Sequence, residues 1–118
     1  MILVVDDEEA LREVIQEVLE MSNVPCICAA SGQEGVEIFK TNQDRIHAVL
    51  LDVQMPLMSG QETFEHLRHI NPDIHIVLMS GRPEHVTMAQ FDNKKHLSYL
   101  EKPFTLDMLS TRIEEVLA

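Results

Sequence analysis

Two short apolar segments, each followed by aspartate, most constrain how this chain can fold. Residues 2–5 are Ile-Leu-Val-Val and precede Asp6 and Asp7, and residues 48–51 are Ala-Val-Leu-Leu and precede Asp52. Continuous apolar runs of this length are typical of strands that are buried on both faces of a parallel sheet. Both strands therefore bring carboxylates to the carboxyl edge of a sheet, which is where open parallel sheets bind ligands.

The three aspartates predict a site for a hard divalent cation. Packed carboxylates repel one another unless protons or a cation intervene. Their oxygen atoms suit Mg²⁺, or Mn²⁺ in its place. We therefore expect Asp6, Asp7 and Asp52 to share one metal ion. The alternative from these residues alone is a set of separate, solvated loop carboxylates.

Apolar residues also recur at helical spacing after each strand. In the segment after Asp7 they stand at i, i+3, i+4, i+7 and i+8, which is typical of an amphipathic helix that covers a sheet. Strands are predicted over residues 2–5, 24–30, 48–52, 74–79 and 97–101, and a helix after each, the third over 61–69, the fourth over 83–91 and the fifth after Thr105. This alternation predicts one α/β domain, residues 1–118, with a parallel sheet, right-handed crossovers and helices on both faces.

Local polar signals predict how several elements begin. Ser31, with Glu34 three residues later, has the form of a capping box, and Thr105 is a good N-cap. Gly60 is expected to allow an unusual backbone dihedral near the start of the third helix. Residues 92–95, Asp-Asn-Lys-Lys, predict a polar turn before the fifth strand.

The net charge of −11 constrains the partners of the chain. Nucleic acid and anionic membranes would both be repelled, so a basic protein surface is the more natural partner. No apolar run approaches the length of a membrane span and no signal segment is recognisable, so we expect a soluble cytoplasmic protein. Cys26 and Cys28 lie too close in sequence for a useful disulfide and are expected to stay reduced.

Polar residues stand at the carboxyl ends of four of the predicted strands: Asp6 and Asp7, Asp52, Ser80 and, just past the fifth strand, Lys102. Together with the string Asp-Val-Gln-Met-Pro-Leu-Met-Ser-Gly from Asp52 and the string Lys-Pro-Phe from Lys102, they make the whole chain resemble the receiver domain of two-component response regulators. The resemblance implies a flavodoxin-like, doubly wound sheet of five parallel strands in the order 2-1-3-4-5.

The resemblance implies a phosphoryl-transfer site. Asp52 corresponds to the phospho-acceptor, which takes a phosphoryl group from a phosphohistidine. Asp6 and Asp7 correspond to the acid pair that holds Mg²⁺ with Asp52, and the backbone carbonyl of Gln54 is the expected further ligand. Lys102 corresponds to the cation that pairs with Asp52 and then with the phosphate. Such a site must neutralise charge on the oxygens of the transferred group, as the metal ion, Lys102 and a hydroxyl donor would do.

The resemblance also implies a conformational switch. Ser80 corresponds to the hydroxyl that turns to bond the new phosphoryl oxygen, and Tyr99 to the aromatic residue that swings inward with it. Phosphorylation adds about −1.5 to −2 charge units. The resulting pull on Ser80 and Lys102 is expected to change the surface of the fourth helix, fifth strand and fifth helix. A cis peptide bond before Pro103 is a further feature of the family.

A signalling switch rather than a turnover enzyme is therefore expected. The implied partner upstream is a sensor histidine kinase or a histidine phosphotransfer protein. The resemblance also allows a homodimer through the surface of the fourth helix, fifth strand and fifth helix, and an output domain in a longer chain. The end of the sequence close after the last predicted helix favours excision from a larger regulator or hybrid kinase over a stand-alone protein.

Two departures and two alternatives accompany this hypothesis. Residues 91–97 lack the Ala-Gly-Ala-type turn common in the family, which leaves the length of the fourth helix open. Gln54 and Arg82 occupy positions that tune the phosphoryl lifetime in this family.

A haloacid-dehalogenase-like phosphatase is one alternative, because it also uses an aspartate and Mg²⁺. That family has Asp-x-Asp where this chain has Asp52-Val53-Gln54. The other alternative is a pseudo-receiver that only binds partners. His66 and His69 are interpreted as solvated helix residues, because two histidines alone rarely bind zinc.

Overall fold

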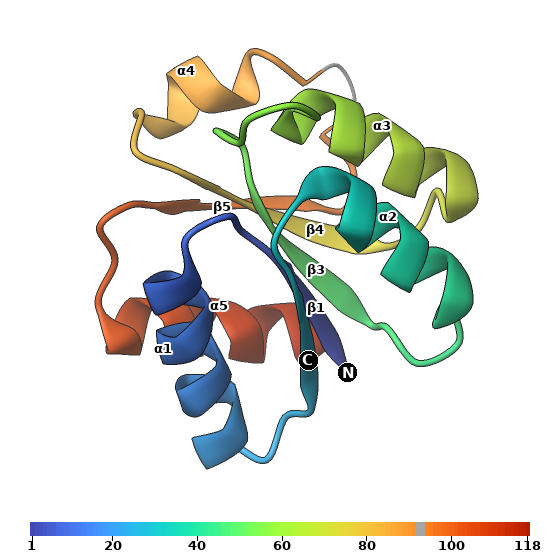
Figure 1. Cartoon of the computed structure of the whole chain (residues 1–118). Coiled ribbons are helices and arrows are strands. Elements are labelled where there is room, and N and C mark those ends of the chain that lie inside the picture. The colour runs from blue at the N-terminus through green and yellow to red at the C-terminus, as the bar shows by residue number, and fades with distance from the viewer. Residues whose placement is uncertain (92–93) are drawn as a thin grey trace.

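A single parallel sheet forms the centre of the molecule in the computed structural model, which describes residues 1–91 and 94–118 (Figure 1). The strands follow the order β2-β1-β3-β4-β5 and pair in parallel throughout. Their bounds are β1 Ile2–Val5, β2 Cys26–Ala29, β3 Ala48–Asp52, β4 His75–Ser80 and β5 Leu97–Glu101. The predicted fold class and strand order are confirmed.

In the described part of the chain, five helices alternate with the strands and cover the sheet on both faces. Figure 1 shows α1 and α5 on one face and α2 and α3 on the other. Their bounds are α1 Glu9–Met21, α2 Gly32–Thr41, α3 Gly60–Ile70, α4 Glu84–Met88 and α5 Leu106–Leu117. None of the described helices is both long enough and apolar enough to cross a membrane.

Two apolar layers, one on each face of the sheet, form the core. Side chains alternate between the faces of a strand, so Leu3 and Val5 of β1 pack under α2 and α3 while Ile2 and Val4 pack under α1 and α5. Every residue of β1 and β3 is buried. Burial on both faces explains why these strands are continuous apolar runs. Because the strands are parallel, the residues that follow them lie at the same edge of the sheet.

Hydroxyl side chains cap three of the helices, and the caps predicted at Ser31 and Thr105 are confirmed. In each case the side-chain oxygen accepts a hydrogen bond from the backbone N–H three residues later, which satisfies a donor that the first turn leaves free. The pairs are Ser31 with Glu34, Ser59 with Glu62, and Thr105 with Met108.

The prediction that Gly60 adopts an unusual backbone dihedral is wrong. No described glycine has a positive φ, and Gly60 is instead the first residue of α3, packed against the backbone of Val53. A Cβ at Gly60 would lie 2.5 Å from Val53 Cα, so only glycine fits there. The left-handed residue of this loop is Leu57, with a φ of 66° and a side chain that is fully exposed.

The fourth helix is shorter than predicted. It spans Glu84–Met88 rather than residues 83–91, and Pro83 precedes it as the N-cap. The polar turn predicted over residues 92–95 includes Asp92 and Asn93, which lie outside the described residues. The second strand begins at Cys26 rather than at residue 24, because Pro25 has no N–H for the ladder and contributes only its carbonyl, which accepts from Ile2.

Candidate functional site

The candidate site lies at the carboxyl edge of the three central strands. Val5 of β1 pairs with Leu51 of β3, so the residues that follow them, Asp6 and Asp52, are neighbours at the same edge. Asp6 is completely buried and Asp52 is 2% exposed. The parallel register therefore brings together two carboxylates that lie 46 residues apart in the sequence.

Asp7 joins Asp6 and Asp52 in one carboxylate cluster. One carboxylate oxygen from each of the three residues lies within 4.8 Å of the others. Backbone N–H groups orient the two buried acids: Glu8 N donates to Asp6 Oδ1 at 2.9 Å, and Gln54 N donates to Asp52 Oδ1 at 3.1 Å. Asp7 is exposed, so the cluster has a side that solvent and ions can reach.

Lys102 supplies the positive charge of the site. Its ammonium nitrogen lies 3.0 Å from Asp6 Oδ2, 3.5 Å from Asp52 Oδ1 and 3.5 Å from Glu8 Oε1. Burial acts to lower the pKa of Lys102, but the hydrogen bond to Asp6 and the charges of Asp52, Asp6 and Glu8 outweigh it, so the pKa is raised. Lys102 therefore remains a cation at neutral pH. The peptide bond between Lys102 and Pro103 is cis.

One lysine does not balance the acids. Burial, and then the charge of Asp6, raise the pKa of Asp52 from 3.8 to about 6, although Lys102 and the Gln54 N–H act to lower it. Charge is costly where it is desolvated and unbalanced. The negative charge of the Asp52 carboxylate is therefore only partly balanced, and a further cation at this site would stabilise it.

The donor set fits a magnesium ion. Three carboxylates that converge from two strand ends are hard oxygen ligands, and Mg²⁺ is commonly held by one or two carboxylates together with water and a phosphate oxygen. Asp6, Asp7 and Asp52 would hold such an ion, which would supply positive charge beside the Asp52 carboxylate. The raised pKa of Asp52, which is due first to burial and then to the charge of Asp6, agrees with a position where a bound cation would be favourable.

A second, hydroxyl-rich group adjoins this site at the end of β4. Ser80 is 1% exposed, and its Oγ accepts hydrogen bonds from Arg82 N and from the Thr87 hydroxyl, both at 3.1 Å. The Tyr99 hydroxyl donates to the carbonyl oxygens of Arg82 and, at 3.3 Å, of Ser80. Ser80 also connects to the lysine segment, because Lys102 N donates to its carbonyl at 2.7 Å. Tyr99 thus lies with its ring buried and its hydroxyl against the β4–α4 loop.

The comparison with known proteins agrees with this arrangement of strand ends. The family model described as "Response regulator receiver domain" matches residues 2–114. The chain belongs to that family. It is a receiver domain of the kind used in two-component signalling.

Relatives of this receiver domain include sensor kinases and response regulators. The Autoinducer 1 sensor kinase/phosphatase LuxN of Vibrio campbellii is 35% identical over 108 residues, which are 92% of this chain and 12% of LuxN. Response regulator RR06 of Streptococcus pneumoniae is 36% identical over 118 residues, which are 98% of this chain and 52% of RR06. The chain therefore spans about half of RR06 and a much smaller part of LuxN.

Solved structures show the same fold. A response regulator receiver domain protein from Clostridium thermocellum is 29% identical and superposes with a TM-score of 0.89, covering 98% of this receiver domain and 92% of that chain. The receiver domain of the hybrid histidine kinase CckA is 26% identical with a TM-score of 0.84, covering 99% and 98% of the two chains.

The structure brings the predicted residues into two connected groups. Asp6, Asp7, Asp52 and Lys102 form the charged group, and Ser80 with Tyr99 forms the hydroxyl group. The amide of Gln54 contacts Asp52.

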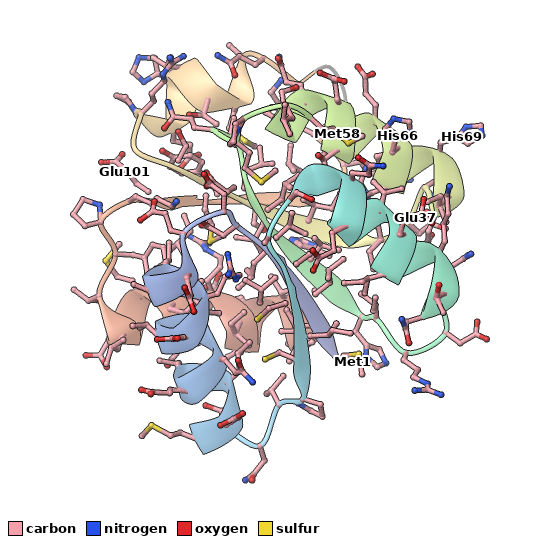
Figure 2. The ribbon with its side chains drawn as sticks, viewed as in Figure 1. Met1, Glu37, Met58, His66, His69 and Glu101 are labelled. Atoms are coloured by element: carbon pink, nitrogen blue, oxygen red, sulfur yellow. The ribbon has the colours of Figure 1, made fainter. Side chains whose placement is uncertain are left out.

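His66 and His69, which were interpreted as solvated helix residues, are not part of this site. His66 and His69 are exposed along α3, and Figure 2 shows both on the outer side of the helix. Neither belongs to the cluster of acids described above.

Sequence reasoning missed two residues of the site. The sequence analysis assigned no site role to Glu8, yet its carboxylate lies 3.5 Å from the Lys102 ammonium nitrogen. The acidic run of residues 6–9 was the available signal. Thr87 contacts Ser80 from α4, and no sequence signal marks it, because a threonine in a short polar helix is ordinary.

Proposed function

We propose that Asp52 accepts a phosphoryl group from a phosphohistidine and that this modification switches the receiver domain. The observation that supports it is a buried carboxylate, 2% exposed, held 3.5 Å from a lysine ammonium and within a cluster of three acids. A nucleophilic carboxylate needs this surrounding positive charge, because the transferred group carries negative charge on three oxygens.

The chemistry assigns one role to each residue. The Asp52 carboxylate forms the new bond to phosphorus as the phosphorus–nitrogen bond of the donor breaks, and the donor imidazole takes up the electron pair. Lys102 neutralises charge on the phosphoryl oxygens. Asp6, Asp7 and the backbone carbonyl of Gln54 would hold Mg²⁺ with Asp52, and the metal ion supplies further neutralisation when bound. Ser80 donates its hydroxyl to a phosphoryl oxygen after transfer.

The switch is proposed to act on the surface of α4, β5 and α5. Ser80 and Tyr99 connect the end of β4 to this surface through the β4–α4 loop. The phosphoryl group adds about −1.5 to −2 charge units at the edge of the sheet. A change at Ser80 would therefore be transmitted to α4 and to the ring of Tyr99, and this surface could also form a homodimer.

The surroundings of the chain are part of the same proposal. We infer that residues 1–118 act as one receiver domain, with a sensor histidine kinase or a histidine phosphotransfer protein upstream and an output domain in a longer protein. LuxN and RR06, which are longer than this chain, support that arrangement. The free thiols of Cys26 and Cys28 fit a reducing, cytoplasmic location. In this role the domain is a signalling switch and not a turnover enzyme.

Labelling with acetyl phosphate tests the proposed function. In the presence of Mg²⁺ we expect one phosphoryl group per chain, none in Asp52→Asn, and full labelling in the control Asp44→Asn. Asp44 is an exposed aspartate in the turn before β3, at the opposite edge of the sheet. Chelation of Mg²⁺ should abolish the labelling.

Two outcomes would contradict the proposal. Absence of labelling in the parent protein would leave only a binding module. Continuous release of phosphate from a monoester substrate would indicate a phosphatase instead, since a receiver domain takes up one group and retains it for a time.

A further inference from the structure

Thr87 is a buried polar residue to which the proposed function assigns no role. It lies on α4, the helix Glu84–Met88, and is 1% exposed. All residues of α4 are described, and Thr87 is the one that is buried. Met88 is partly buried and packs against the core, so the inner side of this short helix combines one apolar contact with the buried threonine side chain.

The Thr87 hydroxyl donates to Ser80 Oγ at 3.1 Å, and Arg82 N donates to the same oxygen at 3.1 Å. A hydroxyl oxygen has two acceptor sites and one donor hydrogen. Both acceptor sites of Ser80 are thus filled by groups that follow it in the β4–α4 segment. The side chain of Ser80 is held toward that segment in this structure.

By the alternation of side chains along their strands, Asp52 and Ser80 belong to opposite faces of the sheet. Ser80 continues the alternation of Ile76 and Leu78, whose side chains pack on the same face as Tyr99. Asp52 continues the alternation of Leu50, which packs on the opposite face. A Ser80 hydroxyl that bonds a phosphoryl group on Asp52 must therefore turn away from Thr87.

We propose that Thr87 is a latch that holds Ser80 in the unphosphorylated position and releases α4 when Ser80 turns toward the modified Asp52. This inference rests on the proposed function, because it assigns a regulatory role at the same site. Breaking the bond between Thr87 and Ser80 costs the unmodified state one buried hydrogen bond, and α4 then loses the side-chain hydrogen bond that joins it to the end of β4. The latch thereby couples Ser80 to the α4 surface.

The test uses beryllofluoride with Mg²⁺ as a mimic of the phosphoryl group on Asp52, and amide NMR shifts as the measure of binding. Thr87→Val keeps the shape of the side chain and removes the hydroxyl. A net hydrogen bond is worth about 1 kcal/mol, so Thr87→Val should bind beryllofluoride about fivefold more tightly than the parent protein. Thr87→Ser, which restores the hydroxyl, should return the affinity to that of the parent protein.

Thr63→Val is the matched control. Thr63 is also a buried threonine, but its hydroxyl donates to the carbonyl of Ser59, the N-cap of α3, and makes no contact with Ser80 that the structure describes. Its affinity for beryllofluoride should match that of the parent protein. A second measurement, hydrogen exchange of the α4 amides without beryllofluoride, should be faster in Thr87→Val than in Thr63→Val.

The outcomes separate the latch from the proposed function. If the parent protein shows no saturable shifts with beryllofluoride and Mg²⁺, the proposed function fails and the latch fails with it. If the parent protein responds while Thr87→Val binds equally or more weakly, only the latch is overturned. Failure of Thr87→Ser to restore the parent affinity would also overturn it. Should Thr87→Val not fold, Thr87→Ala gives the same comparison.

Discussion

Asp52 is held in an environment that opposes its own charge. Its side chain is buried, its nearest charged neighbours include another buried carboxylate, and only part of that charge is balanced by Lys102. The same features that make the carboxylate costly in the unmodified protein leave it responsive to a cation or a phosphoryl group. The function proposed for Asp52 therefore opposes the stability of the folded protein.

The pH dependence of stability should show this competition. In metal-free buffer the pKa of Asp52 is about 6 in the folded protein and 3.8 in its ordinary state, so the folded state binds the proton more tightly. Protonation therefore favours folding, and this contribution is lost as the pH rises through about 6. Asp52→Asn should be more stable than the parent protein at pH 7.5, by about 1–3 kcal/mol.

The difference between Asp52→Asn and the parent protein should shrink below pH 6 and vanish near pH 4. Chemical denaturation at several pH values measures it, with Asp44→Asn as the exposed control. A constant difference across this range would show that Asp52 ionises normally.

Lys102 stabilises the folded protein, because its ammonium group partly neutralises the buried carboxylates of Asp6 and Asp52. Lys102→Met keeps the length of the side chain and removes the ammonium group from Asp6 and Asp52. Removing one partner of a buried ion pair typically costs about 3–5 kcal/mol. We expect Lys102→Met to melt cooperatively but with its unfolding free energy lower by about 3 kcal/mol at pH 7.5.

The control for this change is Lys40→Met. Lys40 lies 3.6 Å from Glu37 on α2, and both side chains are more than half exposed. Exposed pairs contribute little, so this variant should change the unfolding free energy by less than about 1 kcal/mol. Equal stability of the two variants would mean that the charges around Lys102 are solvated.

At the scale of elements, the β3–α3 connection depends on one close backbone contact. Gly60 begins α3 directly against Val53, the residue after Asp52. Gly60 N also donates to the Val53 carbonyl at 3.2 Å. The start of the helix is thereby attached to the segment that contains Asp52.

Gly60→Ala should disturb this contact. The new Cβ would lie 2.5 Å from Val53 Cα, and backbone atoms cannot rotate away as a side chain can. We expect the unfolding free energy to fall by about 2 kcal/mol, as overpacking generally costs, and the amide shifts of residues 52–60 to change.

Gly81→Ala is the control, because its Cβ would meet only Gln54 Oε1 at 4.0 Å and its φ is not positive. It should leave both the unfolding free energy and those amide shifts nearly unchanged. A stable Gly60→Ala variant with parent-like shifts would show that the loop can move apart without cost.

At the scale of the whole molecule, the charge is strongly negative, and three of the acids lie together where two strands end. The net charge is −11, and Asp6, Asp7 and Asp52 share one edge of the sheet. Any cation that binds only the folded protein stabilises it by mass action.

Addition of Mg²⁺ should raise the melting temperature more than sodium chloride of equal ionic strength. A concentration one hundred times the dissociation constant adds about 2.7 kcal/mol to the unfolding free energy. The increase should be smaller in Asp52→Asn, which removes one charged ligand, and unchanged in Asp44→Asn. Equal stabilisation by the two salts would indicate general screening of the net charge rather than a metal site.

The order of elements was predictable because it depends on local patterns. The apolar runs before Asp6 and Asp52 and the helical spacing of apolar residues are short-range properties of the chain, and the caps at Ser31 and Thr105 each involve residues three positions apart. The bounds were less predictable. The fourth helix ends at Met88 rather than at residue 91, and the close contact of Gly60 with the backbone of Val53 is one that no local pattern indicates.

The sequence by itself determined the strands, the helices and which acids, hydroxyl and lysine stand at the strand ends, since these follow from hydrophobic periodicity and position. Only the tertiary structure decided the contacts among them. Lys102 lies closer to Asp6 than to Asp52, and Thr87 rather than solvent contacts Ser80. Such contacts join residues distant in the chain, and their distances depend on strand register and helix packing, which no local sequence pattern specifies.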